Sequence, residues 1–378
     1  MKLNLLLLFT ALLLGCSSDG QYESVRPSGE TADYLSLPDG FSAELYAVNV
    51  PNVRAMTRSP NGILYAGTRG AGNVYAILDT DRDLKADSLI TIASGLNLPV
   101  GVAWHEGDLY VSAVSKVLKF EDIDNHLDQP PDPVTVTDAY PAESHHGWKY
   151  IAFGPDDKLY VPVGAPCNIC EREEEIFSTI TRINPDGSGL EIVAHGVRNS
   201  VGFDWHPGTG ELWFTENGRD FMGDNRPPDE LNRIEKNGSH YGYPYIHSDD
   251  IRDPEFGEKG RDMDVDFIKP EQNLGPHVAA LGMLFYTGDM FPGEYRNQIL
   301  IAEHGSWNRS SKIGYRISMV RLQDSSAISY EPFVEGWLQP DETVLGRPVD
   351  LLQLPDGSVL VSDDYRNKIY RISYKTNL

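Results

Sequence analysis

The chain has 378 residues, with 32 Lys and Arg against 56 Asp and Glu, which gives a formal net charge of −24 at pH 7. This deficit of positive charge argues against nucleic acid as a partner, because binding a polyphosphate requires a basic surface that releases counterions. With 40% apolar and 10% aromatic residues, the chain can bury a core and is not a disordered acidic tail.

The first element in the chain is an export signal. A short basic start is followed by an apolar run from Leu3 to Leu14, which is too short for a spanning helix of about 20 apolar residues. The run ends in Leu-Leu-Gly-Cys, which resembles a bacterial lipobox with Cys16 as the acylated residue. We expect a lipoprotein signal peptide over residues 1–15 and a flexible spacer over residues 16–33. The alternative is a plain signal peptide that happens to contain a Cys.

These features predict an exported lipoprotein on the periplasmic face of a bacterial membrane or on the cell surface. No second long apolar segment follows, so we expect membrane contact through the lipid anchor only.

From residue 53 onward one unit recurs: a short apolar strand, a turn, and a second strand reading roughly Leu-Tyr-Val. The second strands are centred, with gaps of 45, 50, 53, 87 and 60 residues, on Tyr65, Tyr110, Tyr160, Trp213, Leu300 and Leu360. Periods of about 40 to 50 residues with four strands each are typical of β-propeller blades. The repeat therefore predicts an all-β, six-bladed β-propeller forming a single domain over residues 34–378.

Two details of this propeller follow from the same spacing. The gap of 87 residues predicts a long insertion between blades four and five. The strand from Phe41 to Val48 precedes the first unit, so we expect it to complete the last blade and close the ring. A β-sandwich would leave the repeated Pro-x-Gly turns unexplained, and the near absence of helical periodicity disfavours an α/β fold.

An acidic segment between the first two units has the spacing of a calcium loop. Acidic residues occupy loop positions 1, 3, 5 and 9, namely Asp79, Asp81, Asp83 and Asp87. The glycine expected at position 6 is Leu84, and position 12 is Ile90 instead of a bidentate Glu. The segment is therefore either a second calcium site or an acidic hairpin exposed to solvent.

The residues that enter the first strand of each blade converge at one mouth of the propeller channel. These residues are Arg54, Pro99, His146, Arg198 with Asn199, His277 and Arg347. Three arginines and two histidines at one mouth reverse the overall negative charge locally. We expect this mouth to bind an anionic small molecule. Alternatively, some of the arginines pair with acids as struts between blades.

Two cysteines remain after Cys16, in the stretch Pro166-Cys167-Asn168-Ile169-Cys170. In an exported protein this pair is expected to form a disulfide. A thioredoxin-type site is disfavoured because no βαβ pattern surrounds it, and a c-type haem would require His where Glu171 stands.

Six stretches carry a family resemblance: His195–Gly202, Trp213–Gly218, Asp229–Pro244, Ala302–Arg309, Gly346–Asp350 and Ser362–Tyr365. By their order and spacing the chain resembles the glucose/sorbosone dehydrogenases that depend on pyrroloquinoline quinone (PQQ). These are soluble six-bladed propellers, and the resemblance covers roughly residues 37–374.

The resemblance implies catalytic roles for two residues of the channel mouth. The family's catalytic His precedes the third inner strand, which is the place of His146; it acts as general base on the sugar C1 hydroxyl while hydride moves to C5 of the quinone. His145 is the rival, since only one of two adjacent residues points inward along a strand. Arg198 matches the arginine that stabilises the developing charge at C5.

The resemblance also implies the residues that hold the cofactors. Asn199 and Arg347 would bind PQQ, with Arg54 from the same mouth. A Ca²⁺ that bridges the cofactor would be bound by the backbone carbonyls of Gly218 and Arg219.

The chain departs from the family pattern at three places. Val349 stands where a second arginine is expected, and Trp148 lies in the altered segment after the catalytic His, where it either shapes the sugar pocket or packs in the core. The cofactor-binding Lys of the fifth blade has two candidate replacements, Arg309 and Lys312.

The sequence thus predicts a PQQ-dependent dehydrogenase that oxidises an aldose or a sorbosone-like aldehyde. Because no haem motif is present, the electrons are expected to leave to an external acceptor, a cytochrome or a quinone. Two alternatives stay open: a calcium-dependent lactonase and a non-catalytic sugar-binding propeller. Metalloprotease, NTPase and α/β-hydrolase motifs do not occur in the chain.

Overall fold

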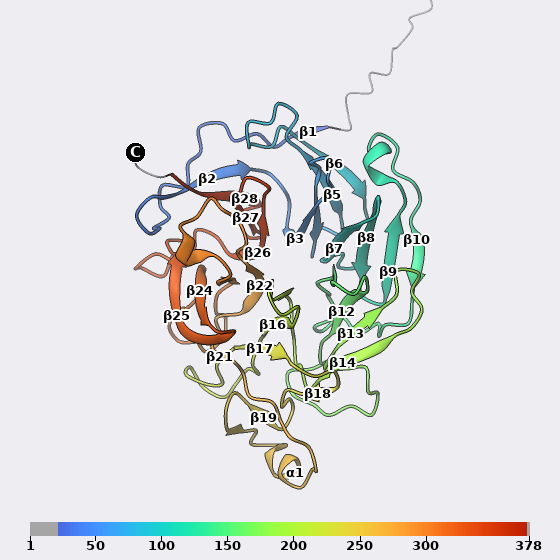
Figure 1. Ribbon diagram of the computed structural model, residues 1–378, viewed down its shortest axis with the longest axis vertical. Helices are drawn as coiled ribbons and strands as arrows, with labels where there is room; N and C mark the ends of the chain where they lie inside the picture. The colour runs from blue at the N-terminus through green and yellow to red at the C-terminus, as the bar shows by residue number, and fades with distance from the viewer. Residues whose placement is uncertain (1–21, 376–378) are drawn as a thin grey trace, which may run out of the picture.

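Six antiparallel sheets surround a central channel in the computed structural model, which describes residues 22–375 (Figure 1). The predicted all-β, six-bladed propeller with a single domain is confirmed. The signal peptide over residues 1–15 and the lipidated Cys16 lie outside the described residues. Within residues 22–375, none of the helices has the length and apolar character needed to cross a membrane.

Each blade runs from an inner strand at the channel to an outer strand at the rim. Blade one consists of β3 (Val53–Arg58), β4 (Leu64–Thr68), β5 (Val74–Leu78) and β6 (Ser88–Ala93). Blade two consists of β7 (Val102–His105), β8 (Asp108–Ala113), β9 (Lys116–Phe120) and β10 (Val134–Thr137), with the 3₁₀ turn η1 (Ile123–Asn125). Blade three consists of β11 (Ala152–Phe153), β12 (Leu159–Val163), β13 (Thr179–Ile183) and β14 (Glu191–His195).

The second half of the ring repeats this order. Blade four consists of β15 (Phe203–Trp205), β16 (Leu212–Glu216), β17 (Glu230–Ile234) and β21 (Gln272–Asn273). Blade five consists of β22 (Ala280–Phe285), β23 (Ile299–Glu303), β24 (Arg316–Gln323) and β25 (Ser326–Val334), with η2 (Gly293–Tyr295). Blade six consists of β26 (Pro348–Gln353), β27 (Val359–Asp363), β28 (Lys368–Tyr374) and β2 (Phe41–Ala47).

Strand β2 closes the ring, as the sequence predicts. It pairs antiparallel with β28, with Phe41 opposite Tyr374 and Leu45 opposite Tyr370. An N-terminal strand therefore completes the sheet that the C-terminal strands begin, and it forms the outer edge of blade six.

The long insertion lies inside blade four and not between blades four and five. The chain leaves the third strand of that blade, β17, and returns only to form its fourth strand, β21. Between them are β18 (Ser239–His240), which pairs parallel with β14 of blade three, the hairpin β19 (Ile246–His247) and β20 (Ile251–Arg252), and helix α1 (Gly257–Arg261). In Figure 1 this insertion projects from the rim of the ring.

The predicted spacer is shorter in the structure than residues 16–33. Strand β1 (Glu23–Ser24) pairs with the outer strand β6 of blade one, and Val25 is fully buried. Ala32 is also buried, so the chain packs on the propeller well before residue 34. The reason is that short apolar side chains scattered among polar ones still fill the seams between blades: Val25 packs between blades six and one, and Ala32 packs between blades five and six.

The core is divided among the blade interfaces. Six apolar clusters of the described chain each join two neighbouring blades, and the second strands of all six blades are buried along their length, except for the half-buried Asp108 at the start of β8. These strands are covered by a neighbouring blade on both faces, which explains why they read as nearly continuous apolar runs in the sequence.

Buried carboxyl groups tie the inner strands to one another. Asp350 on β26 accepts a hydrogen bond from the backbone N–H of Met56 on β3 at 2.8 Å, and Asp204 on β15 accepts one from Phe285 on β22 at 2.8 Å. Inner strands approach so closely that a Cβ on Gly202 would collide with the backbone of Leu281. The result is a rigid ring that fixes the relative positions of the residues at its mouth.

Candidate active site

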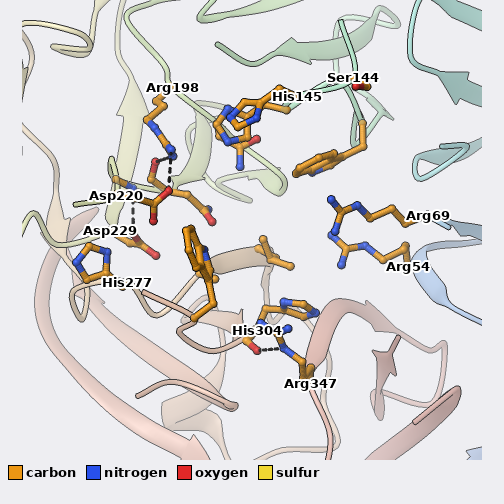
Figure 2. A pocket seen from close by; sticks show the side chains of 18 residues that line it. Arg54, Arg69, Ser144, His145, Arg198, Asp220, Asp229, His277, His304 and Arg347 are labelled. Atoms are coloured by element: carbon orange, nitrogen blue, oxygen red, sulfur yellow. Dashed lines mark hydrogen bonds and ion pairs between the residues drawn. The ribbon is translucent and has the colours of Figure 1, made fainter. Parts of the chain in front are cut away.

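Charged side chains surround a cavity of about 540 Å³ at one mouth of the channel (Figure 2). Its lining includes the predicted residues Arg54, His146, Arg198, Asn199, Gly218 and Arg347. It also includes the predicted His277, whereas Pro99 does not line it. The entrances to the inner strands therefore meet at one site, as expected from the propeller geometry.

His146 is held in a conformation that leaves one ring nitrogen free to act as a base. Its backbone has a φ of 48°, in the left-handed region, and its side chain is buried. Its Nδ1 donates a hydrogen bond to the carbonyl of Ala165 at 2.8 Å, which leaves Nε2 as the unprotonated acceptor. A side chain on Gly164 would collide with the Cβ of His146, so the neighbouring strand end requires glycine.

The surroundings of His146 keep its ring neutral. Burial lowers its pKa well below the ordinary value, and the nearby charges of Arg198 and His145 lower the pKa further. At neutral pH the imidazole is therefore in the form that accepts a proton.

His145 also lines the cavity, with its ring centroid 4.1 Å from that of His146. The expectation that only one of the two points inward is therefore wrong. It assumed a strand, but residues 142–148 form an irregular loop with a turn at 145–146. Burial and the charge of Arg198 lower the pKa of His145 as well.

Arg198 is buried and fixed by hydrogen bonds to every arm of its guanidinium group. Nε donates to the carbonyl of Asn168 at 2.8 Å, and Nη1 donates to the carbonyl of Asn217 at 3.0 Å. Nη2 donates to Oδ1 of Asn168 at 2.9 Å and lies 3.3 Å from Asp220. This set leaves the cation little freedom to move.

The disulfide loop carries one of these partners. Cys167 and Cys170 form a disulfide, and Asn168 lies between them. The N–H of Cys170 donates to the hydroxyl of Tyr243 at 3.0 Å, which anchors the loop on the insertion of blade four. The expected disulfide is therefore present, but the sequence gives no sign of the role of Asn168, because no pattern connects an Asn in a loop to a distant Arg.

A second group of cations faces Arg198 across the cavity (Figure 2). Arg54 pairs with Asp364 at 2.8 Å, and the same carboxylate contacts Nε2 of His304 at 2.8 Å. Arg347 donates to the backbone carbonyls of His304 and Gly305 at 2.9 and 2.8 Å. Arg69 lies over the ring of Trp148 at 4.1 Å.

This group has more positive charge than its own carboxylate can balance. Asp364 is its only acidic partner among the described ion pairs, and the buried Nε of Arg54 has no hydrogen-bond acceptor. Arg69 and His304 are not among the residues predicted for the mouth, because they follow the second strands β4 and β23, whereas the prediction rests on the entrances to first strands. The expected second arginine is Val349, which packs with Val201, Leu281 and Trp148 at the base of the cavity.

The wall beside Arg198 is rich in oxygen atoms. Asp229 accepts hydrogen bonds from the N–H groups of Gly218 at 3.0 Å and Ala280 at 3.1 Å, and burial raises its pKa to about 7. Burial and the charge of Glu230 raise the pKa of Glu216, whose Oε2 has no partner. Gly218 lines the cavity, whereas the side chain of Arg219 turns away to Asp253 at 2.6 Å.

Comparisons with known proteins identify the family. Residues 112–306 match the sequence profile described as Glucose / Sorbosone dehydrogenase. An uncharacterized protein of Borreliella burgdorferi is 36% identical over 359 residues, which cover 92% of each chain. The chain belongs to the glucose/sorbosone dehydrogenase family.

Solved structures share the fold of this chain. The holo form of the PQQ domain of a pyranose dehydrogenase from Coprinopsis cinerea has a TM-score of 0.75 at 18% identity, over 90% of this chain and 97% of that chain. A calcium structure of a family AA12 carbohydrate-active enzyme from Trichoderma reesei has a TM-score of 0.74 at 18% identity, with the same coverage. At this identity the likeness shows the shared fold.

Two residues expected to bind cofactor in this glucose/sorbosone dehydrogenase family member do not line the cavity. Arg309 donates to backbone carbonyls of Asp224 and of Ser311, the latter at 3.0 Å. Lys312 donates to the carbonyl of Glu342 at 2.7 Å and is exposed. The loop after β23 turns both side chains toward neighbouring loops, so neither replaces the family lysine in this structure.

The acidic segment of blade one brings together three carboxylates but already has a cation. The carboxylate oxygens of Asp79, Asp81 and Asp87 lie within 4.8 Å of one another. Arg26 lies 3.5 Å from Asp81 and 2.5 Å from Asp87, and it also pairs with Asp83. This arrangement favours the interpretation as a solvated hairpin that holds the N-terminal segment over the interpretation as a calcium loop.

Proposed function

We propose that this protein is a PQQ-dependent dehydrogenase that oxidises an aldose or a related aldehyde sugar at C1. One observation carries the proposal: a neutral His146, with its free Nε2 at the cavity, faces a set of arginines whose positive charge is not balanced locally. A general base beside an anion-binding surface is the arrangement that oxidation of a hemiacetal by a polyanionic cofactor requires.

The cavity fits the chemistry of PQQ, a flat quinone with several carboxylates. Arg54, Arg69 and Arg347 are the residues that would hold those carboxylates, since within residues 22–375 the group has a buried donor without an acceptor and only one acidic partner. Val349 with Leu281 and Trp148 provides an apolar base. When bound, PQQ would supply the acceptor for two electrons.

The oxygen-rich wall fits a hard divalent cation such as Ca²⁺. The cluster of Glu216, Asp229 and Glu230 is buried, and burial raises the pKa of all three carboxyl groups; repulsion by Glu230 and Asp229 raises the pKa of Glu216 further. Asp220, Asn217 and Gly218 add oxygen atoms on the same wall of the cavity. A bound cation would relieve this repulsion, and it would lower the pKa values of these carboxyl groups.

The residues of the chain divide the work of the reaction. His146 would take the proton of the C1 hydroxyl at Nε2, while its Nδ1–H bond to Ala165 holds the ring and its tautomer. Arg198, fixed by Asn168 and Asn217, would place a positive charge where negative charge develops. His145 is the second titratable group at the same position and would orient the sugar.

The test is reconstitution of the full chain with PQQ and Ca²⁺, followed by dye reduction with a panel of aldoses, sorbosone and aldehydes. His146→Ala is expected to lower kcat by about 10²–10⁴-fold, whereas the control His206→Ala, in a turn of blade four, leaves it unchanged. If the holoprotein forms and no compound reduces the dye, the proposal is wrong. Hydrolysis of lactones by the calcium-loaded, quinone-free protein would establish the lactonase instead.

We also propose that the protein works outside the cytoplasm, anchored by a lipid on Cys16, and passes its electrons to an external cytochrome or quinone. The lipobox-like sequence supports the anchor. The disulfide between Cys167 and Cys170 supports an oxidising compartment. Labelling with a radioactive fatty acid, abolished by Cys16→Ser, tests the anchor.

A further inference from the structure

Two aromatic rings stand exposed at the mouth of the cavity. Phe221 and Trp307 are 69% and 67% exposed, the highest values among the large apolar side chains of the described chain. Their ring centroids lie 5.9 Å apart in an edge-to-face arrangement, and Trp307 also lines the cavity. Adjacent exposed aromatic rings beside a polar cavity indicate a binding surface, because large apolar groups are otherwise withdrawn from water.

The loops that carry these rings are fixed to each other. Ser310, in the loop after β23, donates from its backbone N–H to Asp224 at 3.1 Å, and Asn308 donates to Asp220 at 3.4 Å. His277 contacts the carbonyl of Gly223 at 2.9 Å. The loop of Phe221 is therefore joined to the loop of Trp307 on both sides of Phe221.

Phe221 is displayed at a conformational cost. Its φ of 70° lies in the left-handed region, which is unfavourable for a bulky aromatic residue. The side chain gains no burial in return, since it is largely exposed. A strained backbone that holds an apolar ring in solvent is explained when a ligand covers the ring.

The surface continues from Phe221 into a groove of about 510 Å³ with mixed polarity. Its other lining residues are Met222, Arg226, Asp250, Ile251, Arg252 and Pro254. Neither arginine of the groove makes an ion pair or a side-chain hydrogen bond within residues 22–375, so both keep donors for a ligand. A saccharide presents apolar C–H faces, which stack on aromatic rings, and hydroxyl groups, which need hydrogen-bond donors and acceptors. This surface offers both, whereas a partner protein with an apolar surface would leave the polar groups of the groove without partners.

We propose that Trp307 and Phe221 form an outer subsite for a second sugar ring, so that the preferred substrate is an oligosaccharide oxidised at its reducing end. This inference rests on the proposed function. The inner cavity of about 540 Å³ is shared by the cofactor and the ring being oxidised, so the next ring of a chain emerges at Trp307. Binding energy from that ring, remote from C1, would help to position the reacting hemiacetal.

The test compares kcat/KM for glucose with kcat/KM for cellobiose, maltose and lactose, using the full chain loaded with PQQ and Ca²⁺. At least one disaccharide is expected to have a higher kcat/KM than glucose. Phe221→Ala is expected to lower the ratio of disaccharide to glucose about tenfold, the effect of losing one aromatic contact. Trp307→Ala is expected to lower the ratio at least as much, and Trp307→Phe should restore most of it.

Ile328→Ala is the matched control, because Ile328 is 59% exposed on the outer strand β25 and should change neither value. Calorimetric titration of the cofactor-free full chain with the best disaccharide is a second readout, with binding weakened about tenfold in Phe221→Ala.

The inference is overturned if no disaccharide has a higher kcat/KM than glucose, or if Phe221→Ala changes the kcat/KM of both substrates equally. It is also overturned if the variant slows reduction of a protein acceptor and leaves the sugar ratio unchanged, because the rings then serve electron transfer. If the wild-type protein oxidises no sugar at all, the proposed function fails; the calorimetric comparison still decides whether the two rings bind a saccharide.

Discussion

Arg198 shows how much a single charge at this site depends on its fixed partners. Its guanidinium donates to two backbone carbonyls and one side-chain amide oxygen, so its direction is set before any ligand arrives. A lysine would keep the charge and lose the planar fork that satisfies these acceptors. The site therefore depends on geometry as well as charge at this position.

We expect Arg198→Lys to lower kcat about 10²–10³-fold, the usual effect of removing a preorganised donor to developing charge. Steady-state kinetics of the reconstituted protein measure this effect. The control is Arg182→Lys on blade three, where the arginine pairs with Asp156 and Glu191 outside the cavity. Equal losses in both variants would show that the effect arises from folding and not from the site.

Elements of this fold differ in how far the sequence reveals them. The six blades could be predicted because every second strand is buried on both faces and repeats the same apolar pattern. The insertion was assigned to the wrong position because β21 has only two residues, which is too short for a recognisable pattern. Likewise Arg69, His304 and Asn168 lie in turns, where position in space depends on loop conformation and not on periodicity.

The loop closed by Cys167 and Cys170 is such an element, and its role can be tested apart from stability. The disulfide encloses only a few residues, so its removal should change the melting temperature little. Because Asn168 then moves more freely, we expect a reductant to lower kcat about tenfold through Arg198. The double variant Cys167→Ser/Cys170→Ser should have the lower kcat from the start, and the reductant should not change it. A further loss of kcat in that variant on adding the reductant would contradict this role of the disulfide.

At the scale of the whole molecule, the ring is held together partly by carboxyl groups that are buried without a counter-charge. Burial raises the pKa of Asp204 to about 6 and that of Asp350 to about 7. An unfolded carboxyl group releases its proton near pH 4, whereas Asp350 in the folded ring keeps its proton up to about pH 7. Its contribution to stability is therefore present below about pH 4 and is lost as the pH rises through 7.

We predict that Asp350→Asn gains stability relative to the wild type between pH 5 and pH 8, by about 2 kcal/mol. Chemical denaturation at several pH values measures this difference, in which the titration of all other groups cancels. The control is Asp356→Asn. Hydrogen bonds and Arg371 lower the pKa of Asp356, so its contribution to the pH dependence of stability falls below pH 4. A difference for Asp350→Asn that does not vary with pH would contradict the prediction.

The pairing of β2 with β28 has a consequence for how this protein is made. Strand β2 leaves the ribosome before any blade exists, yet its partner β28 is among the last segments to be synthesised. Five blades can assemble in order behind it, but the ring cannot close until both strands are present. Until then β2 has an unpaired edge, and blade six lacks its outer strand. Synthesis that stops short of β28 therefore yields an open arc whose mouth residues never meet, so the active site is assembled only by a completed chain.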